Sequence, residues 1–145
     1  MTDKCEMPTV NSTTEEIKTI LKTYKTIAVV GLSPKEDRPS FGVSKYLQSV
    51  GYRIIPVNPT IKEVLSEKSY PNLTSIPYKI DIVDVFRDPA FVVSIAKEAV
   101  EIGAKVLWFQ EGVINNDAAE IAKKAGLKVI QNKCILKEHR KISFT

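Results

Sequence analysis

Three copies of one local pattern limit the folds open to this chain. Each copy has an amphipathic segment with helical spacing, then a glycine, then an apolar run of strand length. The three junctions are Val50-Gly51-Tyr52, Ile102-Gly103-Ala104 and Ala125-Gly126-Leu127. Glycine ends many helices because it enters the left-handed conformation without a steric penalty. Helices that alternate with strands through short links predict a parallel sheet with right-handed crossovers.

Five apolar runs have the length of buried strands. They lie near residues 26–30, 52–57, 80–86, 105–110 and 127–130. We therefore predict an α/β fold, a Rossmann-like five-stranded parallel sheet in the order 3-2-1-4-5 with helices on both faces, a three-layer sandwich. Asp81 and Asp84 are unusual in a strand covered on both faces, so we expect them near its N-terminal end or beside polar partners.

The remaining segments complete the expected domain organisation. A capping box at Ser12-Thr13-Thr14-Glu15-Glu16 predicts a first helix. One or two helical turns are expected between Ile61 and Ser69, and a polar tail after Asn132. Residues 1–11 are predicted to be a loose tail and residues 12–145 a single domain.

Composition excludes several classes of protein. With 43 % hydrophobic and 26 % charged residues in 145, an ordered domain is expected. The apolar runs are too short to cross a bilayer and no signal core is seen, so we expect neither membrane insertion nor secretion. Cys5 and Cys134 show no metal-type spacing, which fits a reduced cytoplasmic setting. The net charge of +4 suits a polyanionic ligand, but the lysines are scattered, which argues against nucleic acid.

The predicted sheet places a set of turn residues where a ligand would bind. In an open parallel sheet, ligands bind beyond the carboxyl ends of the strands, where the strand order reverses. The residues at these ends are Gly31-Leu32-Ser33, Val57-Asn58-Pro59, Phe86-Arg87, Gln110-Glu111-Gly112 and Gln131-Asn132. Each group alone can be ordinary turn chemistry. Their shared position favours a binding site.

The turn after the first strand has the features of a phosphate site. Backbone N–H groups at the start of the next helix, near Ser40, would point at an anion and the helix dipole would favour it. Ser33 and Ser40 can add hydroxyl donors, and Arg38, with Lys35 as a further candidate, can pair with phosphate oxygens. The alternatives are that Ser40 only caps the helix and that the charged loop is only solvated.

The end of the second strand argues against NAD. Dinucleotide-binding folds usually have an acidic residue there, which holds the hydroxyls of the adenine ribose. This chain has Asn58 followed by Pro59. A neutral amide does not select a free diol, so a ligand with a phosphate on that ribose is better tolerated.

Taken together, these motifs resemble one family over nearly the whole chain after residue 13: the small stand-alone coenzyme A-binding proteins, whose fold is similar to the N-terminal domain of the succinyl-CoA synthetase α subunit. The matching segments are Val29-Val30-Gly31-x-Ser33-Pro34, Arg38-Pro39-Ser40, Gly51-Tyr52-Arg53-Ile54-Ile55-Pro56-Val57-Asn58-Pro59, Tyr70-Pro71-x-Leu73, Val83-Asp84-Val85-Phe86-Arg87, Trp108-x-Gln110-x-Gly112, Asn132-Lys133-Cys134 and Glu138-His139.

The resemblance implies a role for most of the strand-end residues. Gly31 and Ser33 match the phosphate turn. The segment Val57-Asn58-Pro59 matches the adenosine side, with Lys62 as a following basic residue. Phe86 and Arg87 match a strand end that packs against the cofactor. Gln110-Glu111-Gly112 matches a Thr-Glu-Gly turn of the ligase, with Gln110 in place of the threonine.

The function that the resemblance implies is binding of coenzyme A or an acyl-CoA without catalysis, as a carrier, sensor or regulatory module. The ligase uses a phosphorylated histidine in a second domain, whereas His139 is the only histidine here and is expected to pack. A small NAD(P)-linked oxidoreductase and an in-trans subunit of an acyl-CoA ligase are the alternatives. Lys133 and Lys137 favour the thiolate of Cys134, which is hypothesised to form a mixed disulfide with coenzyme A; an inert thiol is the alternative.

Overall fold

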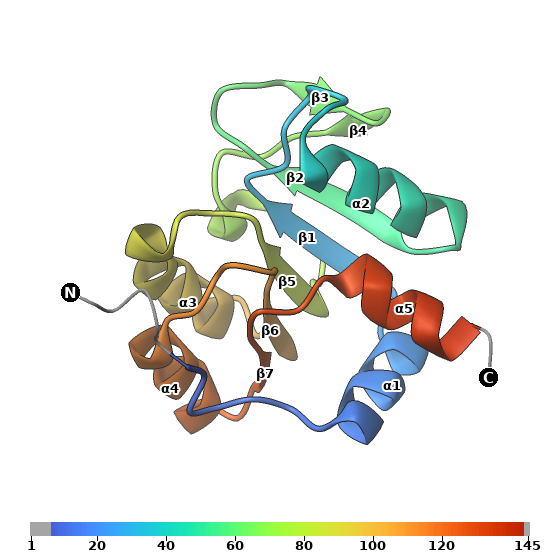
Figure 1. The fold of residues 1–145 in the computed structure, drawn as a ribbon. Coiled ribbons are helices and arrows are strands. Elements are labelled where there is room, and N and C mark those ends of the chain that lie inside the picture. Colours follow the sequence, from blue (N-terminus) through green and yellow to red (C-terminus); the bar gives the residue numbers. More distant parts are fainter. Residues whose placement is uncertain (1–6, 144–145) are drawn as a thin grey trace.

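A five-stranded parallel sheet separates two layers of helices (Figure 1). This computed structural model describes residues 7–143. The strands of the sheet are β1 (Thr26–Val30), β2 (Arg53–Val57), β5 (Ile82–Val85), β6 (Val106–Phe109) and β7 (Lys128–Ile130). The Rossmann-like, three-layer α/β class predicted from the sequence is confirmed.

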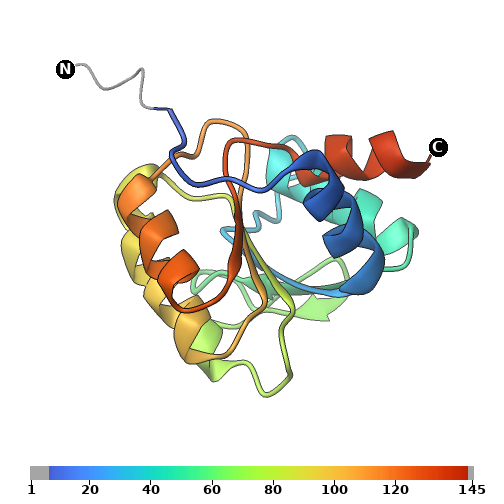
Figure 2. The ribbon, with the colours of Figure 1, turned by 90° about the horizontal axis from the view of Figure 1, so that it is seen from below.

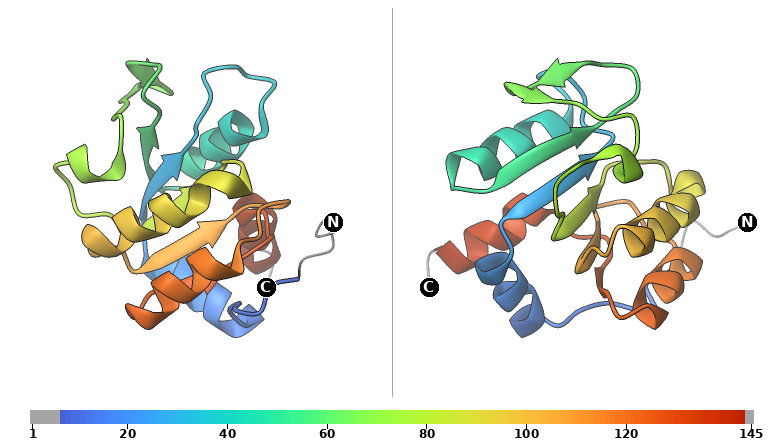
Figure 3. Two further views of the ribbon diagram at one scale, coloured as in Figure 1. Left: turned by 90° about the vertical axis from the view of Figure 1, so that its left-hand side faces the viewer. Right: turned by 180° about the vertical axis from the view of Figure 1, so that it is seen from behind.

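Helices cover both faces of the sheet (Figures 2 and 3), and each face has its own apolar core. The helices are α1 (Thr14–Thr23), α2 (Pro39–Ser49), α3 (Val92–Glu101), α4 (Asn116–Lys124) and α5 (Ile135–Ser143). Helices α3 and α4 bury their alanine-rich stripes on one face, and α1, α2 and α5 cover the other. Within residues 7–143, none of the helices is long and apolar enough to cross a membrane.

The strand order differs from the prediction in one respect. The sheet runs β2-β1-β5-β6-β7, which is 2-1-3-4-5 in chain order rather than 3-2-1-4-5. The third strand, β5, pairs with β1 in register Ile27↔Ile82 and does not lie outside β2. Pro56 explains why β2 is at the edge, because proline has no N–H for a ladder on both sides. The order therefore reverses between β1 and β5.

Two predictions for the segments outside the sheet are wrong: the segment expected to hold one or two helical turns contains a hairpin, and the expected polar tail contains a helix. Residues 61–69 contain a short hairpin, β3 (Glu63–Val64) and β4 (Glu67–Lys68), whose turn places Leu65 and Ser66 at positive φ. The segment after Asn132 forms α5, and a hydrogen bond of 2.7 Å joins Tyr46 Oη and His139 Nδ1 between α2 and α5. A 3-10 turn, η2 (Leu73–Ser75), precedes β5, and another, η3 (Pro89–Phe91), precedes α3.

The N-terminal segment is attached to the sheet and is not loose over residues 7–11. Val10 is buried, and Asn11 exchanges two hydrogen bonds with the backbone of Gln131 at 3.0 and 3.2 Å. Ser12 Oγ donates to the carbonyl of Val129 at 2.8 Å. The segment thus lies against the carboxyl end of β7 (Figure 2) and leads into the expected capping box of α1, which Thr13 and Glu16 form. Residues 1–6 of the predicted tail, with Cys5, lie outside the described residues.

Candidate functional site

The floor of the site is main chain where β1 and β5 end. Gly31 follows β1 with φ +89°, and its N–H donates to the carbonyl of Val57 at 2.9 Å. A Cβ placed on Gly31 would lie 2.7 Å from the carbonyl oxygen of Phe86. The two strand ends therefore approach closely only because this residue is glycine.

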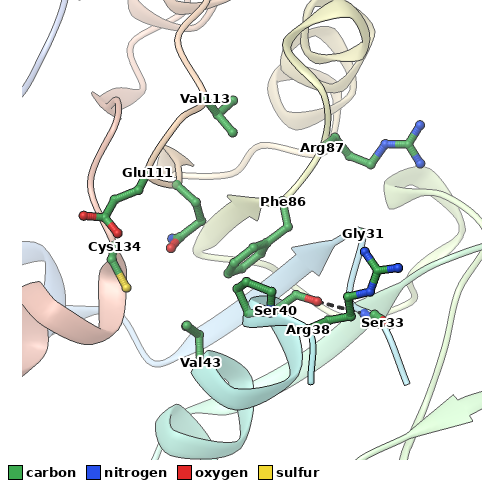
Figure 4. Close-up of a pocket in the computed structure, with 12 residues that line it drawn as sticks. Gly31, Ser33, Arg38, Ser40, Val43, Phe86, Arg87, Glu111, Val113 and Cys134 are labelled. Atoms are coloured by element: carbon green, nitrogen blue, oxygen red, sulfur yellow. Dashed lines mark hydrogen bonds between the residues drawn. The ribbon is translucent and has the colours of Figure 1, made fainter. Parts of the chain in front are cut away.

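A first cavity of about 480 Å³ opens on one side of this floor (Figure 4). Its walls come from the turn after β1, the start of α2, and the ends of β5, β6 and β7. It is lined by Gly31, Ser33, Arg38, Pro39, Ser40, Val43, Phe86, Arg87, Gln110, Glu111, Val113 and Cys134. Eight of the eleven residues predicted as binding residues are in this lining.

A second cavity of about 600 Å³ adjoins the first across Gly31, Phe86 and Arg87, which line both. The other three predicted residues, Val57, Asn58 and Pro59, belong to the second cavity. The structure therefore brings all eleven predicted residues to one continuous edge of the sheet. The additional candidates Lys35 and Lys62 and the segment at Gln131-Asn132 line neither cavity.

Several lining residues of the second cavity were missed by the sequence analysis. They come from the segment before β5 and from the beginning of α3, and they are Thr60, Pro71, Asn72, Leu73, Asp88, Phe91, Ser94, Ile95 and Glu98. The signal for them was the strand order. Once β5 lies beside β1, the helix that follows β5 begins next to the turn that follows β1.

The start of α2 offers hydrogen-bond donors to an anion. Pro39 is the first residue of α2, and the Ser33 N–H donates to Ser40 Oγ at 3.0 Å, the dashed line in Figure 4. Because Ser40 Oγ accepts this bond, its own proton can be donated elsewhere. Arg38 precedes the helix and makes no side-chain bond to the helix cap. The Ser40 hydroxyl and the Arg38 guanidinium at the beginning of the helix together suit a phosphate.

The charged residues around the floor differ in whether they already have a partner of opposite charge. Arg87 stacks its guanidinium over the ring of Phe91, 4.5 Å from the centroid, at the mouth of the second cavity. Glu111 is paired with Lys137 at 3.0 Å, and this carboxylate raises the pKa of the Lys137 ammonium. Arg38 and Arg87 therefore face the cavities beside an acid that already has a partner, which favours a negatively charged ligand.

Asn58 supports the turn that follows β1. Its Nδ2 donates to the carbonyl of Leu32 at 3.0 Å, and its Oδ1 accepts bonds from the N–H and hydroxyl of Thr60 at 2.9 and 2.7 Å. The side chain thus holds the ends of β1 and β2 together. A carboxylate here would also lack the Nδ2 donor for the Leu32 carbonyl.

The two candidate reactive side chains, Cys134 and His139, lie in different places relative to the cavities. Cys134 is half-buried and lines the first cavity, next to Gln110 and Glu111. His139 lines neither cavity; burial lowers its pKa, and it packs between Tyr46 and Tyr52, as its expected packing role requires. Within residues 7–143, no three His, Cys, Asp or Glu side chains gather as a metal site would.

Comparison with known proteins adds independent findings. A family model described as a CoA binding domain matches residues 25–140. The uncharacterized protein YneT of Bacillus subtilis is 46 % identical over 129 residues, which are 89 % of this chain and 96 % of YneT. The solved structure of a hypothetical protein from Pyrococcus horikoshii OT3 superimposes with a TM-score of 0.90 at 41 % identity and covers 99 % of both chains.

A more distant likeness concerns a much larger enzyme. Acetate–CoA ligase [ADP-forming] I of Archaeoglobus fulgidus is 23 % identical over 121 residues. The match covers 77 % of this chain and 18 % of the ligase. The chain therefore corresponds to less than a fifth of that enzyme.

Proposed function

The chain belongs to the CoA-binding domain family, and from this we propose that it binds coenzyme A or an acyl-CoA along the two joined cavities, without catalysis of its own, as a carrier, sensor or regulatory module. The observation that carries the proposal is that the two cavities lie side by side and share Gly31, Phe86 and Arg87 in their linings. A ligand with two unlike halves joined by phosphates fits that arrangement.

Each part of coenzyme A has a matching part of the site. The diphosphate belongs at the glycine floor, beside the start of α2 and Arg38. The second cavity, with polar walls that include Asn72 and Ser94, suits the phosphorylated adenosine. The first cavity, where Val43 and Val113 add apolar surface, suits the pantetheine arm and its thiol.

A direct test compares ligands on the intact protein. Calorimetric titration and melting temperatures with coenzyme A, NAD and NADP should rank coenzyme A first. Arg38→Ala should weaken coenzyme A binding by about tenfold, because a charge-assisted bond to phosphate is lost. Lys45→Ala removes an exposed charge from the same helix, outside both cavities, and should change nothing. Tighter binding of NAD would overturn the proposal in favour of an oxidoreductase.

The in-trans subunit alternative has its own test. The ligase resemblance covers one part of a larger enzyme, so a subunit role needs a separate β-type ligase subunit as a partner. Co-purification with such a subunit, together with ligase activity of the pair, would replace the carrier or sensor role by an enzymatic one.

Cys134 gives the ligand's thiol a candidate covalent partner. In an exchange with CoA disulfide, the Cys134 thiolate attacks one sulfur, forms a protein–CoA disulfide and releases the other CoA as its thiolate. Mass spectrometry should show one CoA adduct on a Cys5→Ser protein and none when Cys134→Ser is added. Absence of an adduct on the Cys5→Ser protein would exclude this chemistry.

A further inference from the structure

Among residues 7–143, Asp84 is the one acid in the core of the sheet, and the proposed function gives it no role. It lies within β5, opposite Val29 of β1 and Trp108 of β6, and its side chain is 0 % exposed. Of the two expectations for this residue, a polar partner is the one found, and the partner is Gln110; Asp84 is not at the N-terminal end of the strand. A leucine would be less costly to bury than a carboxyl, so packing alone does not explain this residue.

A chain of hydrogen bonds runs from Asp84 to the beginning of α5. The amide Nε2 of Gln110 donates to Asp84 Oδ1 at 2.5 Å. The backbone N–H of Ile135 donates to Gln110 Oε1 at 3.4 Å. The chain therefore connects β5, the end of β6 and the first residue of α5.

The two ends of this hydrogen-bond chain determine the orientation of the Gln110 amide. The Ile135 N–H needs an acceptor, so Oε1 must face it and the NH₂ group must face Asp84. Burial raises the pKa of Asp84 to about 8, so the carboxyl is neutral at pH 7 and Oδ1 accepts the bond as a carbonyl oxygen. Asp84 Oδ2 has no hydrogen-bond partner among residues 7–143. The bond to Gln110 is therefore the hydrogen bond that the Asp84 side chain makes there.

Gln110 connects this chain to the binding site. It is 4 % exposed and lines the first cavity, as does Cys134, the residue before Ile135. We propose that Asp84 is a positioning residue, which fixes the Gln110 amide and the start of α5 and thereby the shape of the wall that Gln110 and Cys134 give to the first cavity. The part of this inference that concerns ligand affinity rests on the proposed binding of coenzyme A.

Two substitutions separate positioning from packing. Asp84→Asn keeps an acceptor oxygen for the Gln110 NH₂ group, and it should bind coenzyme A within about twofold of the natural protein. Asp84→Leu keeps the branched shape, with two methyl groups in place of the two oxygens, and removes the acceptor. It should stay folded and bind about tenfold more weakly, the size expected when a buried NH₂ group loses its partner. Equal affinity of Asp84→Leu and the natural protein would overturn the inference.

A second readout does not depend on any ligand. The two side-chain N–H signals of Gln110, identified by their loss in Gln110→Ala, should be sharp and protected in the natural protein and in Asp84→Asn, and shifted and exchanging in Asp84→Leu. Unchanged Gln110 signals in Asp84→Leu would overturn the inference, even if coenzyme A does not bind. Failure of coenzyme A binding with the expected signals would overturn the proposed function alone.

The same signals test the inference without the leucine variant. Raising the pH through 8 ionises Asp84, so the Gln110 signals of the natural protein should move together with the carboxyl ¹³C signal of Asp84. Other ionisable side chains lie on α5 and α2, among them Glu138, His139 and Tyr46, and the Asp84→Asn spectrum, in which Gln110 should not follow such a curve, accounts for them. Gln110 signals that stay unchanged while Asp84 ionises would contradict the positioning role.

Discussion

Asp84 carries a proton in the folded protein at a pH where the unfolded chain has released it. Its pKa rises to about 8 by burial, from an ordinary value near 3.8. Between these values unfolding releases a proton, so the free energy of unfolding contributed by this group falls as the pH rises, by at most about 1.4 kcal/mol per pH unit. Urea titrations from pH 5 to 8 should show this fall in the natural protein and not in Asp84→Asn. Parallel curves for the two proteins would contradict it.

Gly31 is required for two separable reasons, its positive φ and the contact with Phe86. Gly126 has a similar φ of +94° and no heavy atom within 4 Å of a placed Cβ, so it serves as the matched control. Gly126→Ala should lower the free energy of unfolding by about 1 kcal/mol from backbone strain alone. Gly31→Ala should lose about 1–3 kcal/mol more, because its Cβ meets backbone. Equal losses in urea denaturation would show that the contact relaxes freely.

At the scale of single residues, the sequence identified the strand-end positions well. All eleven predicted residues line the two cavities, because parallel strands bring their carboxyl ends to one edge whatever their order. Ser94 and Glu98 were missed because their place depends on which side of β1 receives β5. The bonds of Asn58 and Asp84 also depend on contacts between distant segments, which no local pattern reveals.

At the scale of elements, the periodic segments were predictable and the short or charged ones were not. The helix–glycine–strand pattern identifies α2, α3, α4 and the strands that follow them, since local spacing suffices there. Helix α5 has few apolar residues and becomes stable through its contacts with α1 and α2. Pro56 was a readable sign that β2 is an edge strand.

The side chain of Asn11 attaches the N-terminal segment near the end of β7, and its removal tests what this attachment contributes. Asn11→Ala removes both bonds to the Gln131 backbone and leaves an N–H and a carbonyl there without these partners. The free energy of unfolding should fall by about 1–2 kcal/mol. Amide hydrogen exchange should accelerate at Gln131 and along β7, but not in β2 at the opposite edge. Unchanged exchange at Gln131 would show that the segment is not needed there.

At the scale of the whole molecule, the two cavities act as one site only if one ligand spans them. Adenosine 3′,5′-bisphosphate and pantetheine each offer one half of coenzyme A. Calorimetry should find coenzyme A at least about 100-fold tighter than either fragment, because joining the halves makes the second contact intramolecular. A bisphosphate that equals coenzyme A in affinity would show that the first cavity contributes nothing.

The close approach of Gly31 to Phe86 also limits how such a site can be altered. A surface built from peptide groups keeps its contour through almost any exchange of amino acids, except at the glycine itself. Preference for a different nucleotide must therefore arise on the flanks, in the loop that ends at Arg38 or in the first turn of α3. Redesign for a new ligand is best begun there, with the glycine untouched.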